Sequence, residues 1–293
     1  MPVNNAGVSR RSLLGGAGGA VAMASLPGKA TATTPSPTHL FVTEAGKGRN
    51  VMLLHGWTAD GQDWSWQLPV LETRYRTITV DLRGHGRSPV PPPGGYLPAD
   101  YVADIEVLIA RRYKGERFIL IGHSMGGQIA ARLAARRPDL VEAVVSVDGS
   151  LGFAAETASL FGKVSNDLYA GDPATVAPAL FESVYDKATP AALRRWHARR
   201  VQGMPVHVVR ESFGPLFLGT NQVGVGRPSE MFCRGLRIPF YHMCRDEAQA
   251  ERMRPWFTHP QSQVEMWREA GHWIMQDRPE VVNLALTAWI DKL

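Results

Sequence analysis

Short apolar or β-branched runs recur along the chain from about residue 40, and longer segments with helical spacing separate them. Most of these runs lack alternating polar residues, which is typical of strands buried on both faces of a sheet. Six runs are predicted as strands: Val51–Leu54, Thr77–Asp81, Phe118–Ile121, Ala143–Val147, Ile238–Met243 and Val264–Trp267. Their alternation with helical segments predicts an α/β fold with a mostly parallel sheet covered by helices on both faces.

Helical spacing is clearest in three segments. Asp100–Arg112 and Met125–Arg137 are predicted as helices, and Pro138 ends the second pattern. The C-terminal segment has one apolar stripe that should pack onto the sheet. The stripe consists of Val282, Leu286, Trp289, Ile290 and Leu293.

The stretch from about Gly152 to Arg234 separates two predicted strands and has helical patterning. It is too long for a simple connection, so we expect an inserted helical lid. Its aromatic residues line the underside of that lid or form its own core. They are Phe153, Phe161, Tyr169, Phe181, Tyr185, Trp196, Phe213, Phe217 and Phe232.

The first 32 residues differ from the rest of the chain. Paired arginines within Ser9–Leu14 precede a weakly apolar Gly/Ala stretch, and A-x-A patterns end at Ala24 and Ala32. This order of regions resembles a twin-arginine export signal. We expect cleavage after Ala32, a linker over residues 33–39 and one domain over residues 40–293. The mature protein is then secreted, periplasmic or otherwise extracytoplasmic.

Composition excludes some partners. The chain has 44% apolar and 20% charged residues, as ordinary globular proteins do. No apolar run reaches the roughly 20 residues of a membrane-spanning helix. Loss of Arg10, Arg11 and Lys29 with the predicted signal would lower the net charge from +5 to +2. The basic residues near Arg194–Arg200 have helical spacing without a long run, so we expect no nucleic-acid partner.

Cys233 and Cys244 are the two cysteines of the chain. They flank a predicted strand from about Leu236 to Met243, which would hold them about 25 Å apart at about 3.3 Å per residue. That separation is beyond disulfide reach, so free thiols are expected. Two cysteines without a histidine at ligand spacing also predict no structural zinc site.

The pentapeptide Gly122–Gly126 has the pattern G-x-S-x-G, with Ser124 at its centre. It follows a predicted strand and opens a predicted helix. On such a sharp turn the serine hydroxyl is exposed above the sheet, and the glycines prevent collisions with neighbouring backbone. The helix start also directs unpaired N–H groups toward charge that develops beside Ser124. Ser124 is therefore the candidate nucleophile.

Three motifs, in this order and spacing, resemble the α/β-hydrolase superfamily. They are His55–Trp57 after one strand, Asp81–Ser88 after the next and Gly122–Gly127 after the third. The resemblance covers residues 40–293 except the lid. It implies an oxyanion hole formed by the backbone N–H groups of Trp57 and Met125. Two fixed donors of this kind stabilise the tetrahedral intermediate of acyl transfer.

A serine hydroxyl needs a base to take its proton. His272 follows the last predicted strand and precedes the last helix, where the family carries its catalytic histidine. The acid that orients it remains open. Asp148 ends the strand after the nucleophile helix and is favoured. Asp246 and Glu247 are the alternatives, because they follow the strand after which the family most often carries its acid. In that register, however, Arg245 replaces the family's usual glycine and Ala248 occupies the position of the acid.

The expected chemistry is acyl transfer to water without a metal or organic cofactor. Trp57, Trp64, Trp66 and Trp273, together with the aromatic lid, favour an apolar small-molecule ester or lactone as substrate. The alternatives are a cofactor-free haloperoxidase or perhydrolase, a C–C bond hydrolase, an acyltransferase and a noncatalytic binding protein. Sequence does not decide the natural substrate or the oligomeric state.

Overall fold

The computed structural model describes residues 36–187 and 189–293. The predicted export signal (residues 1–32), with Arg10 and Arg11, and the first part of the linker lie outside the described residues. Among the described residues, no helix is long and apolar enough to cross a membrane.

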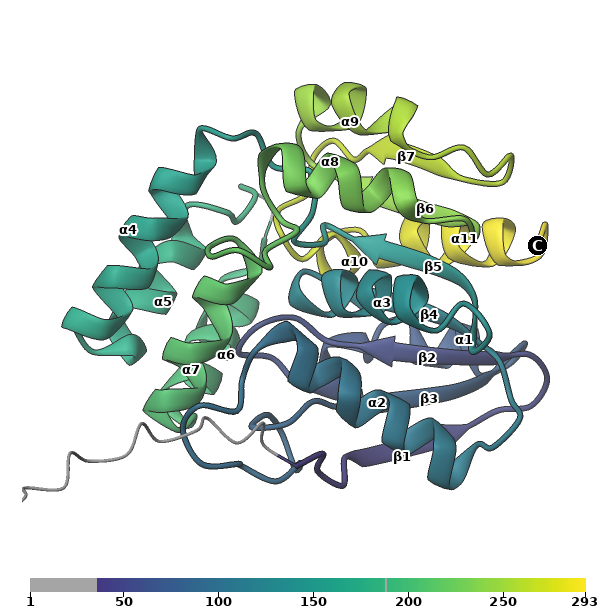
Figure 1. Cartoon of the computed structure of the whole chain (residues 1–293), viewed down its shortest axis with the longest axis horizontal. Helices are drawn as coiled ribbons and strands as arrows, with labels where there is room; N and C mark the ends of the chain where they lie inside the picture. The colour runs from purple at the N-terminus through teal and green to yellow at the C-terminus, as the bar shows by residue number, and fades with distance from the viewer. Residues whose placement is uncertain (1–35, 188) are drawn as a thin grey trace, which may run out of the picture. The chain divides into compact units, whose positions relative to one another are not determined.

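One seven-stranded sheet forms the centre of the fold, in the order β1-β3-β2-β4-β5-β6-β7 (Figure 1). All neighbouring strands are parallel except β1, which pairs antiparallel with β3. The predicted α/β fold with a mostly parallel sheet is therefore confirmed. The strands are β1 (Phe41–Ala45), β2 (Asn50–Leu54), β3 (Arg76–Asp81), β4 (Phe118–His123), β5 (Val141–Val147), β6 (Phe240–Cys244) and β7 (Gln263–Met266).

All six predicted strands are present, and β1 was not predicted. This edge strand is half-buried and contains Thr43 and Glu44, so it lacks an apolar run. The prediction for β6 was two residues too long at its start, because the strand begins at Phe240 after Pro239. Cys233 accordingly lies in a helix and not beside the strand. Both cysteines are buried free thiols, as predicted.

Helices cover both faces of the sheet (Figure 1). The two central predictions are confirmed, since α2 spans Pro98–Arg112 and α3 spans Met125–Arg136. These helices pack together on one face. On the other face lie α1 (Leu68–Leu71) and the C-terminal α11 (Pro279–Ile290), whose apolar stripe is buried at Val282, Leu286 and Ile290. The short helix α9 (Glu247–Met253) lies between β6 and β7, and α10 (Ile274–Asp277) follows β7 and leads to α11.

The insertion between β5 and β6 is helical, as expected. Its helices α4 to α7 lie together beside one end of the sheet in Figure 1, and α8 leads the chain back to β6. The helices are α4 (Thr157–Ala170), α5 (Pro173–Glu182), α6 (Ala191–Gln202), α7 (Val206–Phe213) and α8 (Gly226–Gly235). A single bridge between Phe153 and Val225 joins the two ends of the lid.

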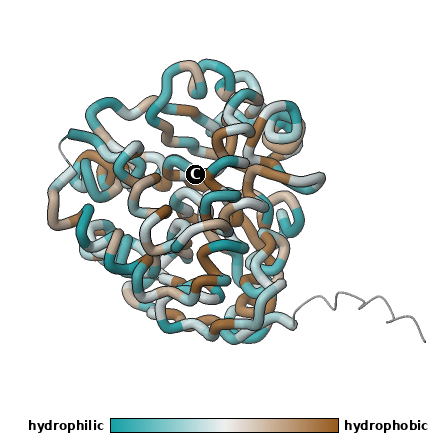
Figure 2. Tube along the Cα trace, turned by 90° about the vertical axis from the view of Figure 1, so that its left-hand side faces the viewer, coloured by the Kyte–Doolittle hydropathy of each residue, from teal (hydrophilic) through white to brown (hydrophobic). Residues whose placement is uncertain are grey.

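Apolar side chains from the strands form the core. Val51, Leu53 and Ile119 are fully buried between the helical layers. In Figure 2 hydrophobic stretches run through the middle of the fold, while outer loops are mostly hydrophilic. Burial of such side chains contributes about 25 cal/mol per Å² of apolar surface, so this layer holds the strand ends in place. The candidate site lies at those ends.

Candidate active site

Ser124 stands at a sharp turn between β4 and α3. Its backbone has φ +50° and ψ −114°, a region that a residue with a side chain rarely adopts. Such a conformation costs on the order of 1–3 kcal/mol and persists only where the surrounding structure enforces it. The Ser124 residue is 8% exposed. The turn thus presents the hydroxyl at the carboxyl end of the sheet.

The glycines of the pentapeptide allow this turn because neighbouring backbone lies very close. A Cβ atom on Gly122 would lie 2.3 Å from the carbonyl oxygen of Gly126. A Cβ atom on Gly126 would lie 2.3 Å from the carbonyl oxygen of Leu54 in β2. Both contacts are with backbone atoms, so neither can be relieved by a side-chain rotation. The glycines are therefore a steric requirement of the turn.

His272 lies in the loop between β7 and α10, and hydrogen bonds fix its backbone on both sides. Its N–H donates to the Val184 carbonyl in the lid at 2.8 Å. Its own carbonyl lies 2.9 Å from Nε2 of His123, the residue before Ser124. Because a carbonyl can only accept, Nε2 of His123 carries the proton. Burial lowers the pKa of His123 to about 3, so this ring stays neutral.

The candidate acids have different surroundings. Nδ1 of His272 lies 2.6 Å from Oδ2 of Asp148, which follows β5 at φ +42°. Asp246 instead caps α9 by accepting the Gln249 N–H at 2.6 Å. Glu247 pairs with Arg254 at 2.9 Å. Within the described residues, Asp148 is thus the one candidate acid in hydrogen-bond contact with His272.

Asp148 carries a second charged contact that sequence reasoning missed. Nε of Arg245 donates to Oδ2 of Asp148 at 2.7 Å, the same oxygen that faces His272. Burial alone raises the pKa of Asp148, but the Arg245 charge and the His272 hydrogen bond together outweigh it and hold the pKa well below its usual range. Asp148 is therefore an anion. Arg245 was noted in the sequence only as a departure from the family's glycine.

Ser124 and His272 line one cavity of about 110 Å³ under the lid. The Ser124 hydroxyl makes no hydrogen bond within the described part of the chain, so it is free to face this space. Its wall is largely aromatic and aliphatic. The lining residues are Trp57, His123, Ser124, Ser150, Phe153, Phe161, Leu180, Phe181, Val184, Phe213, Leu216, Phe217, Arg245, His272 and Trp273.

Comparisons with known proteins place this geometry in a family. The family model described as the alpha/beta hydrolase fold matches residues 49–202. The chain is also 30% identical over 276 residues to the 2-(acetamidomethylene)succinate hydrolase of Mesorhizobium japonicum, covering 86% of this chain and 91% of that protein. The chain belongs to the α/β-hydrolase fold family.

Other relatives of this α/β-hydrolase differ in activity. A non-heme haloperoxidase of Rhodococcus erythropolis is 40% identical over 106 residues, which cover 34% of this chain and 38% of that protein. An esterase from Exiguobacterium antarcticum superposes with a TM-score of 0.73 at 23% identity, covering 87% of this chain and 96% of that one. The esterase likeness shows a common fold.

The expected oxyanion donors lie close to Ser124, the candidate nucleophile of this α/β-hydrolase. Met125 is the first residue of α3, where an N–H has no partner inside the helix. A Cβ atom on Gly56 would lie 3.2 Å from Cβ of Ser124, so the turn that carries Trp57 passes close to the serine. Within the described residues, no hydrogen bond occupies the backbone N–H groups of Trp57 and Met125. Both are available to a bound oxyanion.

Some of the tryptophans expected to contact substrate line the cavity, and others do not. Trp57 and Trp273 line the cavity. Trp64 and Trp66 do not, contrary to the expectation. Trp64 is fully buried in the core, and the Trp66 ring packs at 5.9 Å from that of Trp196 on the lid. Position near the His-Gly motif was the only signal for these two, and it does not determine which way a side chain points.

Some of the aromatic residues of the lid also line the cavity, and others do not. Five of the nine, all phenylalanines, line the cavity, and the Phe161 and Phe217 rings stack with centroids 3.8 Å apart. Tyr169, Tyr185, Trp196 and Phe232 lie outside its wall. The phenylalanines therefore form the apolar roof over Ser124.

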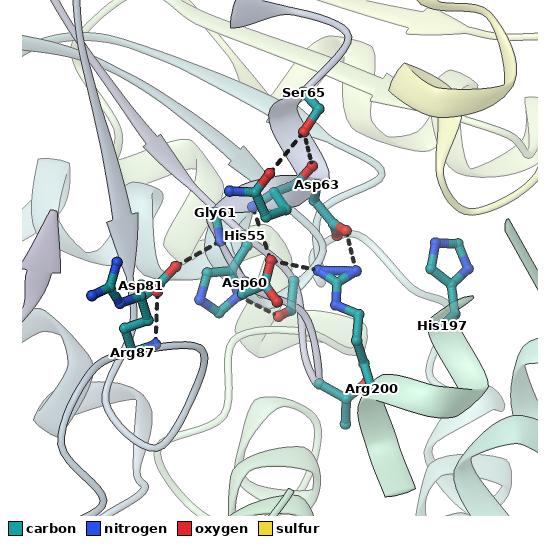
Figure 3. Close-up of polar contacts among 12 residues, drawn as sticks. His55, Asp60, Gly61, Asp63, Ser65, Asp81, Arg87, His197 and Arg200 are labelled. Carbon is teal, nitrogen blue, oxygen red and sulfur yellow. Dashed lines mark hydrogen bonds and ion pairs between the residues drawn. The ribbon is translucent and has the colours of Figure 1, made fainter. Parts of the chain in front are cut away.

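Charged and polar contacts join the lid to the core beside this roof. Arg200 of α6 pairs with Asp63 and, at 3.0 Å, with Asp60, on either side of the start of the short helix η1 (Gly61–Trp64). Figure 3 shows the guanidinium reaching both carboxylates, with His197 on the same helix nearby. The His197 ring stacks 4.0 Å from Trp273, next to the candidate base. Lid position and the candidate site are thus physically linked.

The part of the chain that the structure describes contains no candidate metal site. No three His, Cys, Asp or Glu side chains there are grouped so that they could hold an ion.

Proposed function

We propose that this α/β-hydrolase cleaves a carboxylic ester or lactone of an apolar small molecule through an acyl-enzyme. Ser124 is the nucleophile, His272 the general base and Asp148 the acid that orients the imidazole. The observation that carries the proposal is the 2.6 Å contact between His272 and Asp148 at the wall of the cavity that also contains Ser124.

In the proposed reaction, His272 takes the proton of the Ser124 hydroxyl as its oxygen attacks the substrate carbonyl. Its Nδ1–H donates to the Asp148 anion, so the other ring nitrogen is the one that accepts. The hydrogen bond between Ser124 and His272 forms as the substrate binds, since such contacts are often longer in an empty site. The N–H groups of Trp57 and Met125 stabilise the oxyanion. The alcohol then leaves with the proton, and water releases the acyl group by the same steps.

The cavity supports an apolar acyl group. Its phenylalanine roof offers few hydrogen-bond partners for a sugar or peptide. At about 110 Å³ it is smaller than the roughly 300–1,000 Å³ of common ligand sites, so with the lid in this position it holds only part of a drug-sized substrate. The named relatives include a 2-(acetamidomethylene)succinate hydrolase and a non-heme haloperoxidase, so their names favour no single substrate.

Active-site labelling and ester hydrolysis test this function directly. A fluorophosphonate should label wild-type protein but not Ser124→Ala. Exposed Ser159 on α4 offers the matched control, and Ser159→Ala should be labelled like wild type. A series of neutral 4-nitrophenyl esters and simple lactones should be hydrolysed by wild type only. Absence of both labelling and hydrolysis would reject a serine hydrolase.

Perhydrolysis is the second candidate function, and the similarity to the haloperoxidase favours it. The same serine and base would transfer an acyl group to hydrogen peroxide instead of water. Perhydrolysis is measured as the formation of peracetic acid from acetate and hydrogen peroxide, with Ser124→Ala as the control. Ester hydrolysis without peracid formation would restrict the enzyme to hydrolysis.

We also propose that residues 1–32 are a twin-arginine export signal. The paired arginines and the following Gly/Ala stretch support this. Expression of the full chain with Arg10→Lys and Arg11→Lys together should retain the precursor in the cytoplasm, while wild type is exported and begins at Thr33. Equal export of both proteins would contradict the proposal.

A further inference from the structure

Arg245 introduces a permanent charge into an otherwise apolar wall. It follows β6 and lines the same cavity as Ser124 and His272. Among the described lining residues, no other side chain is permanently charged. Its side chain is 29% exposed, whereas that of its partner Asp148 is 6% exposed. The guanidinium therefore extends from a buried anion toward accessible space.

Only part of this guanidinium is used. An arginine has five N–H donors. Nε of Arg245 donates to Asp148, but its two terminal nitrogens have no hydrogen-bond partner within the described residues. Four N–H groups thus remain available beside the cavity.

Arg83 provides a comparison, because its side chain has a purely structural role. Its Nε and one terminal nitrogen donate to both oxygens of Asp104, and its other terminal nitrogen donates to the Gly95 carbonyl at 2.8 Å. All three of its nitrogens have partners, and the side chain is fully buried. Arg245 differs in every one of these respects. Its contact with Asp148 alone does not account for the open terminal end.

An anionic oxygen is the best partner for such an end. Hydrogen bonds from a guanidinium to a carboxylate are about twice as strong as neutral ones, and the planar terminal edge fits a carboxylate with two parallel bonds. The rest of the cavity wall is largely apolar, and a hydrogen bond in such surroundings is electrostatically stronger than in water.

We propose that Arg245 determines specificity by binding a substrate carboxylate. The substrate class is then an ester or lactone with an apolar body and one carboxylate group near the scissile carbonyl. This inference rests on the proposed serine hydrolase function and narrows its substrate.

Two esters of similar size test the proposal. The first is the 4-nitrophenyl monoester of glutaric acid, which carries a free carboxylate, and the second is neutral 4-nitrophenyl valerate. Wild type should have a kcat/KM at least about tenfold higher for the glutarate ester, the lower end of what a charged hydrogen bond contributes. Arg245→Gln should lower that preference roughly 10- to 100-fold, mainly through KM, and Arg245→Lys should restore part of it.

The opposite results overturn it. An equal fall in kcat/KM for both esters in Arg245→Gln would mean that Arg245 acts only through Asp148 and does not bind the substrate. A wild-type preference for 4-nitrophenyl valerate would also reject carboxylate binding. In either case, fluorophosphonate labelling of Ser124 and hydrolysis of 4-nitrophenyl valerate would still support the serine hydrolase function. Loss of labelling and of hydrolysis of both esters by wild type would instead reject that function.

Inhibition of the wild-type enzyme provides a test that needs no variant. Valerate should inhibit hydrolysis of the neutral ester at least about tenfold more strongly than valeramide, its uncharged amide, because only valerate pairs with the guanidinium. Equal inhibition by the two compounds would reject the proposal, even if Arg245→Gln failed to fold.

Discussion

Asp148 and His272 lie 124 residues apart in the chain and meet through a 2.6 Å hydrogen bond at the ends of the central strands. The contact depends on two separate pieces of backbone. β5 brings Asp148 into a left-handed turn, and the Val184 carbonyl of the lid holds the His272 backbone. Asp148 and His272 are therefore positioned by the sheet and the lid together.

Replacement of each candidate acid in turn should show whether Asp148 or Asp246 orients His272. Asp148→Asn keeps the shape but removes the charge that holds the imidazole in the correct tautomer, so kcat for a neutral ester should fall about a thousandfold or more. Asp246→Asn should stay within about twofold of wild type, because asparagine also caps helices well. Thermal unfolding of both variants checks that they fold. The reverse order of effects would make Asp246 the catalytic acid.

The fold could be predicted because its signals are local. Buried strands such as Phe118–His123 are continuous apolar runs, and the nucleophile turn combines a strand, a glycine pattern and a helix. The edge strand Phe41–Ala45 was missed because its half-polar sequence has no apolar run. Its strand conformation is stabilised by hydrogen bonds to β3, a partner that lies about 35 residues further along the chain.

The site could be predicted only in part because its remaining contacts join distant segments. Asp148 and Asp246 both follow strands, and only the spatial position of His272 distinguishes them. Trp64 sits near the motif in sequence but points into the core. Arg245 interacts with a residue 97 positions away, a relationship that no spacing pattern contains.

Buried histidines should make the protein sensitive to mild acid. Burial lowers the pKa of His85 and His123 to about 3, against about 6.5 in an unfolded chain. Between those values the unfolded chain binds more protons, so their contribution is complete above pH 6.5 and is lost as pH falls toward 3. Each costs up to about 2 kcal/mol of unfolding free energy at pH 5. Urea unfolding from pH 8 to pH 4 measures the loss.

A variant pair assigns that pH dependence. His85→Gln should reduce the loss of unfolding free energy between pH 8 and pH 5 by up to about 2 kcal/mol, leaving the part due to His123, whereas His39→Gln, at an exposed position, should not reduce it. A free energy of unfolding that stays constant between pH 8 and pH 5 would show that these rings do not govern acid stability.

Two glycine substitutions should have opposite effects on stability. Gly126→Ala brings a Cβ atom against the Leu54 carbonyl and should lower the free energy of unfolding by about 3 kcal/mol. A Cβ atom on Gly162, within α4, would have no neighbour within 4 Å. Gly162→Ala should therefore raise stability by about 0.5–1 kcal/mol through helix propensity alone. Urea denaturation distinguishes them, and a neutral Gly126→Ala would show that the turn can open without cost.

Loss of the lid contact at Arg200 should destabilise the protein and loosen the lid. Asp63 has a fully buried side chain, and Arg200→Ala leaves its charge without the arginine, which typically costs about 3–5 kcal/mol. Limited proteolysis should then cut within α4 to α7 at denaturant concentrations that leave wild type intact. Exposed Arg199 on the same helix supplies the control, and Arg199→Ala should behave like wild type.

A second substitution shows whether the unpaired charge is the cause. Asp63→Asn in the Arg200→Ala background removes that charge and should recover a good part of the lost stability, since a neutral amide is far less costly to bury than a carboxylate. Additive losses from the two substitutions would mean that the residues act independently. The lid would then be held mainly by its apolar contacts, such as the stacking of His197 on Trp273.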